Sequence, residues 1–593
     1  MQVRRFSAFW NEDGTISDNV PEWIKKRDRL RDMAFPSPYT DQPDRLADSM
    51  EQAIKVLNAL KPDKQGWGCL GDEPTDDSGG PDYGRAKAAR IAAQSAPLEE
   101  VIQQSADMFK GLPNWNHPLV MPNVLPPANI ASIAASFMTD MFSPNLIEGE
   151  YSWNVHFSEL ESAAMLADLI GWDPVKAGGL FTFGGAGCYF YGLKYALTSV
   201  LGVQSRHKGI RTDGKVLVSQ QGHYCKLNST DWSGLGMDNI IDIETDDRNS
   251  MDLNHLEAVM ARLHSEGTPV IAVMCTMGTT DAFGMDPVAQ VRKLIDKYPN
   301  PPGYGRPFLY CDAVIGWSWL MFRDYDFSEN PLGFSAKVLP IIRKNYEAVM
   351  DMRHADAVGC DFHKVGWTPY NCSIFVFQDN ADFQRLMLRP GADYLQERTE
   401  YNPGLYTFEV SRSASYSMAA WATLKFLGQE GFQVMLGGIL EVQQHLRNLL
   451  KKERTMVCVN EDDYGFVTLF RVYPKGVDAE MQYRLERTCP DFRKDLERHN
   501  ILQQAVADKL WEWSRGKHPE GVDEQQCSLP APYISYTSGF RPTAYNQKRK
   551  DPRAVIYALK SFPMNLNISA ESMSIMIKLV QEARDQIAEQ GCG

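Results

Sequence analysis

The chain has 593 residues and a mass of 66.9 kDa, which is enough for two or three domains around a large core. It is 44% hydrophobic and 23% charged, as ordinary globular proteins are, and its formal net charge is -14. This charge argues against a nucleic-acid or acidic-membrane partner, because both need a basic protein surface. No apolar run approaches the roughly 18 residues that a membrane-spanning helix needs, so we expect no membrane segment.

The cysteines argue against disulfides and against a zinc site. The chain has 11 cysteines but no Cys-x-x-Cys pair, and several, such as Cys275, Cys311 and Cys360, lie in or beside apolar segments. We therefore expect reduced thiols in the core and no bound metal. The N-terminal sequence has two arginines without a following apolar stretch. The sequence thus predicts no secretory signal and a cytoplasmic protein.

Residues 1–114 are expected to form an N-terminal extension. The segment 66–84 is rich in Gly, Asp and Pro and is typical of a loop, and helical stretches flank it. Such an extension could wrap around a partner subunit or be poorly ordered, and the sequence does not decide between the two.

Residues 178–315 alternate between strands and helices. Residues 252–265 have apolar positions at helical spacing, and Asp286-Pro287 is expected to cap another helix. Continuous apolar strands between amphipathic helices indicate a mostly parallel sheet covered on both faces, with ligands beyond the carboxyl ends of the strands. The predicted strands are the segment beginning at Gly178 and the segments 215–219, 239–243, 269–276 and 307–314.

The pattern changes after about residue 410. Residues 418–431 and 432–451 predict two long helices, and strand-like pieces and a last helix follow. We predict an α/β protein with a large domain at 115–410 and a smaller α+β domain at 411–593.

The segment 357–378, AVGCDFHKVGWTPYNCSIFVFQ, places Lys364 between two apolar strands. Burial disfavours the ammonium form and lowers the pKa of a lysine. A lysine that is partly neutral is a nucleophile, and its usual use is a Schiff base with a carbonyl compound. The alternative is a lysine at a strand end whose amine extends to water.

Four polar features precede Lys364, each at the end of a predicted strand. The glycine-rich turn 182–187 could surround an anion with backbone N–H groups, or serve packing alone. His223 and Thr279 could contact a ligand, or be a structural histidine and a turn hydroxyl. Asp312 is a carboxylate at the end of an apolar strand, which is unfavourable unless it meets a cation. It either caps the next turn or keeps a ring nitrogen protonated.

A glycine turn, a histidine, a strand-end aspartate and a lysine between strands, in this order, suggest pyridoxal phosphate. From about residue 115 to 430 the chain resembles the group II amino-acid decarboxylases, the family of aromatic amino acid, glutamate and bacterial tyrosine decarboxylases. Asp-Phe-His-Lys (361–364) resembles the family's Asp-Pro-His-Lys, and CTMGTTDAFGMDPV (275–288) its Gly-Thr-Thr element. YCDAVIGWS (310–318) resembles its Val-Asp-Ala-Ala-Tyr-Gly-Gly, and GHYCKLNSTDWSGLG (222–236) contains its histidine.

The resemblance implies the fold of pyridoxal-phosphate-dependent transferases (aspartate aminotransferase-like, fold type I) and decarboxylation of an L-amino acid to an amine and CO2. Lys364 would form the Schiff base, Asp312 would pair with the pyridine nitrogen, and His223 would stack on the ring. Thr279 would lie near the ring hydroxyl or the substrate carboxylate. Three residues would hold the phosphate: His363, Gly185 and Ala186.

The family also has a mobile loop after the lysine, with a tyrosine that protonates the product carbon. Tyr394 lies at the matching place, and Tyr401 and Tyr406 are nearby rivals. In this family the active site is built at a homodimer interface, so the resemblance further implies a homodimer with a shared site.

The sequence departs from the family pattern at several positions. Ala186 stands where Ser is frequent, Tyr189 where Asn is frequent, Val314 where a second Ala is found, and Trp317 replaces a Gly. These changes leave three alternatives open: an aldehyde-forming decarboxylase or carbon–carbon lyase on the same scaffold, a non-catalytic protein with this fold, or an unrelated α/β enzyme in which Lys364 is structural.

The substrate is not identified by the sequence. The segment after Lys364 is most similar to the bacterial tyrosine-decarboxylase type. An acidic substrate would need an arginine near the site, for which Arg412 is a candidate. Several aromatic residues could line an aromatic pocket or belong to the core: Trp115, Trp153, Trp317 and Tyr370.

Overall fold

The computed structural model describes residues 21–40, 44–62, 68–71, 83–391, 395–460, 465–515, 532–546 and 551–589. The chain divides into two compact units, Met1–Pro113 and Asn114–Gly593. No helix in these described ranges combines the length and apolar character that crossing a bilayer requires.

The first unit is helical in its described part. Helix α2 packs against α4, and Arg45 at the start of α2 pairs with Glu99 in α4. The predicted loop at 66–84 lies largely outside the described residues. The helices are α1 (Glu22–Ala34), α2 (Leu46–Asn58), α3 (Tyr83–Ala88) and α4 (Leu98–Asp107).

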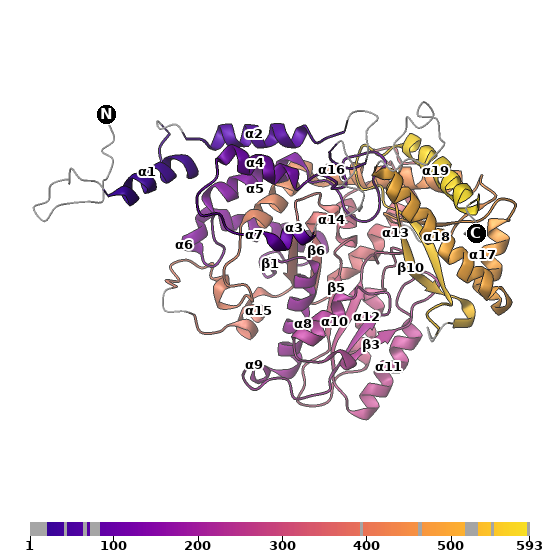
Figure 1. Ribbon diagram of the computed structural model, residues 1–593. Helices are drawn as coiled ribbons and strands as arrows, with labels where there is room; N and C mark the ends of the chain where they lie inside the picture. The colour runs from indigo at the N-terminus through magenta and orange to yellow at the C-terminus, as the bar shows by residue number, and fades with distance from the viewer. Residues whose placement is uncertain are drawn as a thin grey trace, which may run out of the picture. The chain divides into compact units, whose positions relative to one another are not determined.

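A seven-stranded sheet forms the centre of the second unit (Figure 1), in the order β1-β7-β6-β5-β4-β2-β3. Strands β3, β2, β4, β5 and β6 are parallel, and β7 runs antiparallel to both of its neighbours, β6 and β1. The mostly parallel sheet predicted from the sequence is thus confirmed. The strands are β1 (Gly178–Thr182), β2 (Lys215–Ser219), β3 (Ile240–Ile243), β4 (Val270–Thr276), β5 (Phe308–Asp312), β6 (Ala357–Asp361) and β7 (Ser373–Phe377).

Both faces of this sheet are buried, which explains the continuous apolar strands. In β5, Phe308 and Tyr310 pack into the core on the side of α8, whereas Leu309 and Cys311 enter the core on the side of α7, α11 and α12. The helices of this part are α5 (Ile130–Phe142), α6 (Gly149–Ser152), α7 (Phe157–Ile170), α8 (Gly185–Leu201), α9 (Gln204–Lys208), α10 (Cys225–Trp232), α11 (Leu253–Glu266), α12 (Val288–Lys297), α13 (Leu339–Met350), α14 (Phe362–Val365) and α15 (Asn380–Met387).

The predicted helix at 252–265 is α11, where Asp252 accepts hydrogen bonds from the N–H groups of Asn254 and His255. The predicted cap at Asp286 is wrong. Its carboxylate faces away from α12 and accepts from the backbone N–H groups of Thr276 and Met251, both at 2.7 Å. Burial raises the pKa of Asp286 to about 7.

The C-terminal region (residues 411–593) combines long helices with a small sheet of order β10-β11-β9-β8, in which all pairs are antiparallel. The two long helices predicted at 418–451 form one element, α16, with a break at Gly428, whose φ of 55° is not helical. The elements are α16 (Ser415–Leu450), β8 (Met456–Cys458), β9 (Thr468–Val472), α17 (Ala479–Thr488), α18 (Arg493–Ser514), β10 (Ser535–Pro542), β11 (Val555–Ser561) and α19 (Ala570–Glu589).

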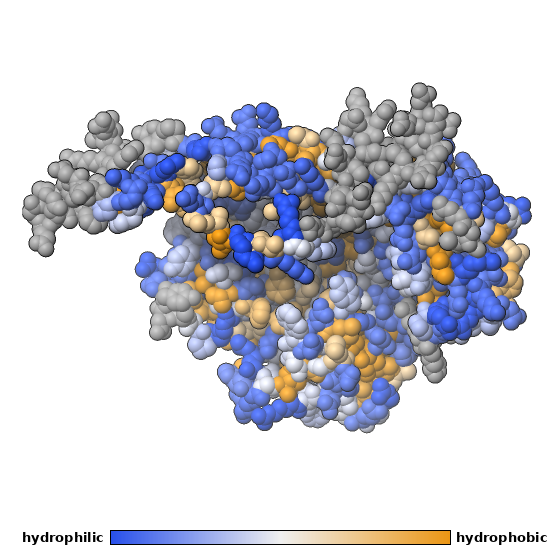
Figure 2. Space-filling model, viewed as in Figure 1, coloured by the Kyte–Doolittle hydropathy of each residue, from blue (hydrophilic) through white to orange (hydrophobic). Residues whose placement is uncertain are grey.

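Apolar side chains also remain on the surface. The face drawn in Figure 2 is mostly hydrophilic, with hydrophobic patches between polar residues. Helix α5 carries a concentrated set of exposed apolar side chains: Ile130, Ile133, Phe137, Met138, Met141 and Phe142. Such a set is typical of a surface that another protein surface covers.

Candidate active site

Lys364 lies in α14, the short turn of helix between β6 and β7. The turn is fixed because the backbone N–H groups of Phe362 and His363 donate to the carbonyl of Cys372, at 2.8 and 3.1 Å. The side chain of Lys364 is 21% exposed, and its Nζ lies 2.8 Å from Oδ2 of Asp361. The amine of Lys364 therefore lies at the carboxyl end of β6.

The environment of Lys364 corrects one expectation. Burial lowers the pKa of this lysine, but the nearby carboxylates of Asp361 and Asp312 outweigh burial, so that its pKa lies above the ordinary value. The amine is therefore held as an ammonium ion by the protein alone. It must lose a proton before it can act as a nucleophile.

Asp361 is a member of the site that the sequence interpretation did not assign a role. It is fully buried at the end of β6, and its Oδ1 accepts a 2.6 Å hydrogen bond from the hydroxyl of Ser373. Asp361 and Ser373 are directly opposite each other in the β6–β7 pairing. The available signal was the acidic residue at a strand end, three positions before the lysine.

Asp312 ends β5 and is buried, yet its Oδ1 has no hydrogen-bond partner among the described residues. Burial raises its pKa to about 6, although the cation of Lys364 opposes the rise. An unpaired buried carboxylate oxygen is unfavourable. A cationic donor opposite Oδ1, such as a protonated ring nitrogen, would remove this deficit.

The glycine turn lies against the same residues. Gly184 has φ of 106°, and α8 begins at Gly185. A Cβ atom on Gly185 would lie 2.9 Å from Cγ1 of Val314 and 3.0 Å from Oδ2 of Asp361, so glycine lets the start of α8 approach these two side chains closely. Ala186 follows and is exposed. Backbone N–H groups at this helix start suit a phosphate.

His223 precedes α10 and interacts electrostatically with Lys364 and Asp361. Burial and the neighbouring lysine lower its pKa, so the ring is neutral at pH 7. Its Nδ1 accepts a hydrogen bond from the N–H of Cys225 at 3.2 Å, which leaves the proton on Nε2. A neutral ring at this place suits stacking on a flat aromatic group.

Two predicted cofactor contacts already have partners within the protein. The hydroxyl of Thr279 accepts from the N–H of Gly284 at 2.9 Å and closes the turn after β4. His363 is buried, with Nδ1 3.0 Å from the carbonyl oxygen of Cys372 and Nε2 3.4 Å from Oδ2 of Asp361. His363 lies beside Asp361, whereas the hydroxyl of Thr279 is used as an acceptor within its own turn.

The tyrosine candidates have different outcomes. Tyr394 lies outside the described residues. Tyr401 is buried and donates to Oε1 of Glu159 at 2.6 Å. Tyr406 is half-buried against Phe383. Tyr370, which was considered for an aromatic pocket, packs its half-exposed ring 4.3 Å from that of His363.

Arg412 and Trp317 are placed in the core. Arg412 binds Glu159 through both terminal nitrogens, at 2.6 and 3.0 Å. It is therefore committed to a protein carboxylate rather than facing a ligand. Trp317 is fully buried and donates from Nε1 to the carbonyl oxygen of Asp361 at 3.0 Å. The indole of Trp317 therefore fixes the backbone at Asp361, next to Lys364.

The residues present fit pyridoxal phosphate. The unpaired Oδ1 of Asp312 can meet the ring nitrogen, Lys364 can hold the aldehyde carbon, and the tight glycine turn leaves room for the phosphate. The fit rests on the donor set and on the unpaired oxygen.

Comparisons with known proteins agree with a pyridoxal phosphate site. Residues 81–472 match the pyridoxal-dependent decarboxylase conserved domain. The chain is 22% identical to L-2,4-diaminobutyrate decarboxylase from Acinetobacter baumannii over 66% of this chain and 75% of the relative. It is 28% identical to L-tyrosine decarboxylase from Enterococcus faecalis over 41% of each chain. The apo form of mouse CSAD superposes with a TM-score of 0.71 at 15% identity, covering 91% of this chain and 98% of that chain.

The superposition confirms the predicted fold, a mostly parallel α/β sheet followed by a small antiparallel sheet. The domain match covers most of the chain and contains the glycine turn, the histidine, the aspartate and the lysine. The chain therefore belongs to the pyridoxal-dependent decarboxylase family, the group II decarboxylases.

Proposed function

We propose that this protein decarboxylates an L-amino acid to the corresponding amine and CO2, with Lys364 as the residue that holds pyridoxal phosphate. The observation that carries the proposal is the group formed by Lys364, Asp361 and Asp312, in which the amine is paired and Oδ1 of Asp312 is not. Pyridoxal phosphate, when bound, supplies an aldehyde for the substrate amine and a ring that accepts the electrons of the broken bond.

The protein's own groups divide the remaining work. Asp312 would face the ring nitrogen and, opposite a cation, would be ionised at neutral pH, so that it would keep that nitrogen protonated. Asp361 accepts the proton that Lys364 must lose, because its Oδ2 is 2.8 Å from Nζ. His223 would cover one face of the ring as a neutral imidazole. The N–H groups of Gly185 and Ala186 at the start of α8 would hold the phosphate.

Protonation of the product carbon is assigned to Tyr394 by the resemblance to the family. Tyr401 is less suited to this role, because its hydroxyl is bound to Glu159 in the core. The substrate is proposed only as an L-amino acid. Arg412 is unsuited to recognise an acidic side chain, because Glu159 neutralises it.

A second candidate is another lyase on the same scaffold, one that forms an aldehyde or cleaves a carbon–carbon bond. Two observations favour keeping it. Val314 lies directly against the glycine turn, and the buried hydroxyl of Tyr189, which interacts electrostatically with Asp312, has no partner among the described residues. Assays of amine, aldehyde and ammonia in one reaction distinguish the two functions. A non-catalytic protein would give none of these products.

We further propose a homodimer. The exposed apolar side chains of α5 support it, because a second copy would cover them. Light scattering after gel filtration should give twice the chain mass over a range of concentrations. A monomer throughout that range would contradict the dimer.

An absorbance spectrum before and after borohydride, followed by peptide mapping, tests the assignment. We expect a visible band that borohydride removes, with the label on Lys364. Screening amino acids for released CO2 then identifies the substrate. A protein that stays colourless with added pyridoxal phosphate would contradict the proposed function.

A further inference from the structure

The turn at residues 277–286, between β4 and α12, is built from hydrogen bonds of its own. The hydroxyl of Thr279 accepts from the N–H of Gly284 at 2.9 Å, and the N–H of Thr279 donates to the carbonyl oxygen of Gly284 at 3.0 Å. At the base of the turn, the N–H of Met277 donates to the carbonyl oxygen of Asp312 at 2.8 Å. Thr279 is therefore part of a closed turn that adjoins Asp312, and a shift of this turn would move Thr279.

Phe283, in the same turn, has a φ of 59°. A positive φ is uncommon for a bulky residue and persists only where the surrounding contacts impose it. Here such contacts come from the C-terminal region. The ring of Phe283 packs edge to face on that of Phe466, with 5.1 Å between the ring centroids, and a Cβ atom on Gly465 would lie 2.2 Å from Cδ1 of Phe283. The C-terminal region thus fits closely against the turn.

Asp281, also in this turn, binds two buried side chains of the C-terminal sheet. Its Oδ1 lies 3.1 Å from Nζ of Lys560 in β11, and its Oδ2 accepts from the hydroxyl of Thr537 in β10 at 2.8 Å. Lys560 is 6% exposed, whereas the side chain of Asp281 is 32% exposed. A buried ammonium group is unfavourable without a counter-charge. Lys560 therefore favours the position of the turn in which the carboxylate of Asp281 reaches it.

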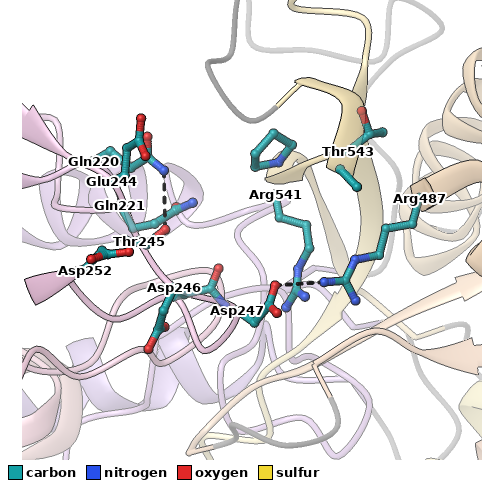
Figure 3. A pocket seen from close by; sticks show the side chains of 13 residues that line it. Gln220, Gln221, Glu244, Thr245, Asp246, Asp247, Asp252, Arg487, Arg541 and Thr543 are labelled. Carbon is teal, nitrogen blue, oxygen red and sulfur yellow. Dashed lines mark hydrogen bonds and ion pairs between the residues drawn. The ribbon is translucent and has the colours of Figure 1, made fainter. Parts of the chain in front are cut away.

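The C-terminal sheet holds the loop before His223 less tightly. A cavity of about 420 Å³ lies between this loop and the end of β10, with Gln221 on one wall and Arg541 on the other (Figure 3). Nε2 of Gln221 donates to the carbonyl oxygen of Phe540 in β10 at 3.5 Å, which is long for a hydrogen bond. Of these two contacts between the C-terminal sheet and the loops of the candidate active site, the ion pair of Asp281 is the stronger.

We propose that Asp281 is a positioning residue of the active site. Through Asp281, the C-terminal sheet holds the turn and its Thr279 next to the backbone of Asp312. The internal hydrogen bonds give the turn its shape, whereas its contacts with the C-terminal region set its place. The inference rests on the proposed function, in which Thr279 would lie near the cofactor ring or the substrate carboxylate. Because a small displacement of a group near the reacting atoms lowers turnover, loss of the Asp281 carboxylate should affect turnover as well as stability.

Amide hydrogen exchange of the purified chain, read by mass spectrometry of its peptides, measures how often the turn opens. Asp281→Asn removes the charge that faces Lys560, and Lys560→Met removes the ammonium group but keeps an apolar side chain in its place. Each should speed exchange in residues 277–286 by about tenfold or more. The control Asp495→Asn, which removes an exposed pair with Arg498 in α18, should leave it unchanged. Unchanged exchange of the turn in both test variants would overturn the proposal.

Turnover of the holoenzyme tests whether the place of the turn matters to the reaction. With the amino acid found by release of CO2, Asp281→Asn should lower kcat/KM by about tenfold, while the visible band shows that the cofactor is still bound. If Asp281 acts through Thr279, adding Asp281→Asn to Thr279→Ala should lower kcat/KM little further. A combined loss equal to the product of the two single losses would overturn the proposal, because the two residues would then act independently.

The two measurements separate this inference from the proposed function. If the wild-type chain shows no visible band and releases no CO2 from any amino acid, the proposed function fails, and exchange in the turn alone decides whether Asp281 positions it. If the wild type is active and the turn opens in both variants while kcat/KM stays unchanged, the proposed function stands. Asp281 would then only stabilise the fold, and the inference would be wrong.

Discussion

Two of the buried clusters of charged side chains in the second unit differ in how fully their carboxylates are bonded. In the arginine cluster (Arg412, Glu159 and Tyr401), four hydrogen bonds reach the two oxygens of Glu159, two from Arg412, one from Tyr401 and one from a backbone N–H. In the lysine cluster (Lys364, Asp361 and Asp312), Asp361 is similarly well bonded, but Oδ1 of Asp312 is not.

The difference separates structure from function. In the arginine cluster both carboxylate oxygens of Glu159 are bonded within the protein, although Nε of Arg412 has no partner among the described residues, and removal of such a buried pair damages folding. A buried carboxylate that lacks a partner imposes a free-energy cost that the fold tolerates when a ligand will remove it. Mutations in the arginine cluster should therefore act on stability, and those in the lysine cluster on catalysis.

The largest effect is expected for Lys364→Ala. Loss of the nucleophile should lower kcat by roughly 10⁴-fold or more and remove the visible absorbance band of the holoenzyme. The fold should persist, because the side chain is partly exposed at the site. Circular dichroism checks the fold. A variant with the normal spectrum and turnover would show that the amine is structural.

The second-largest effect is expected for Asp312→Asn. The amide keeps the shape but cannot hold a proton on the ring nitrogen, so kcat should fall by roughly 10³-fold while the cofactor stays bound. Dialysis against buffer, followed by a fluorescence assay of the retained cofactor, separates binding from turnover. A decrease in kcat of less than about tenfold would show that the carboxylate of Asp312 has a structural role.

Sequence reasoning identifies the fold well, because both faces of the parallel sheet are buried. Continuous apolar runs predict β2 at 215–219 without error and β4 at 269–276 within one residue. The antiparallel direction of β7 and its place between β6 and β1 were not predicted. The sequence of a short, buried, mostly apolar strand such as β7 does not indicate which strands lie beside it or in which direction it runs.

The site was predicted in part. Lys364, Asp312 and His223 are recognisable because each follows a strand that ends at the same edge of the sheet. The role of Ser373 depends on its pairing with Asp361 across β6 and β7, and the role of Arg412 depends on a residue 253 positions away. The raised pKa of Lys364 has the same origin, since two aspartates from different strands meet the amine only in the folded chain.

Arg412→Ala tests whether the arginine cluster acts on stability. Glu159 would remain buried without its cation, which should lower the free energy of unfolding by about 3 kcal/mol or more. The matched control is Arg343→Ala, which removes an exposed pair with Glu347 and should cost less than about 0.5 kcal/mol. Urea unfolding measures both. If the Arg412→Ala protein were as stable as the wild type but inactive, Arg412 would instead have a role in the active site.

The pH dependence of the free energy of unfolding of the apoprotein should reflect the titration of Asp312. Its pKa of about 6 in the folded state lies above the ordinary 3.8, so the folded protein binds more protons between these values. Stability should therefore fall as pH rises from about 4 to about 6 and level off above, by roughly 3 kcal/mol for about two units. Asp312→Asn should remove this component from the urea midpoints. Equal pH profiles for both proteins would contradict the assignment.

The smallest effect is expected for Ser373→Ala, which removes the hydrogen bond to Oδ1 of Asp361. A hydrogen bond to a charged group contributes about 1.5–3 kcal/mol, so kcat should fall by roughly tenfold or somewhat more. Because Asp361 holds the amine of Lys364, the change should appear in kcat and in its pH profile more than in KM. The control Ser265→Ala, on the exposed face of α11, should change neither. If Ser373→Ala lowered the free energy of unfolding but left kcat unchanged, the hydroxyl of Ser373 would only stabilise the pairing of β6 with β7. Asp361 would then position Lys364 without help from this hydroxyl.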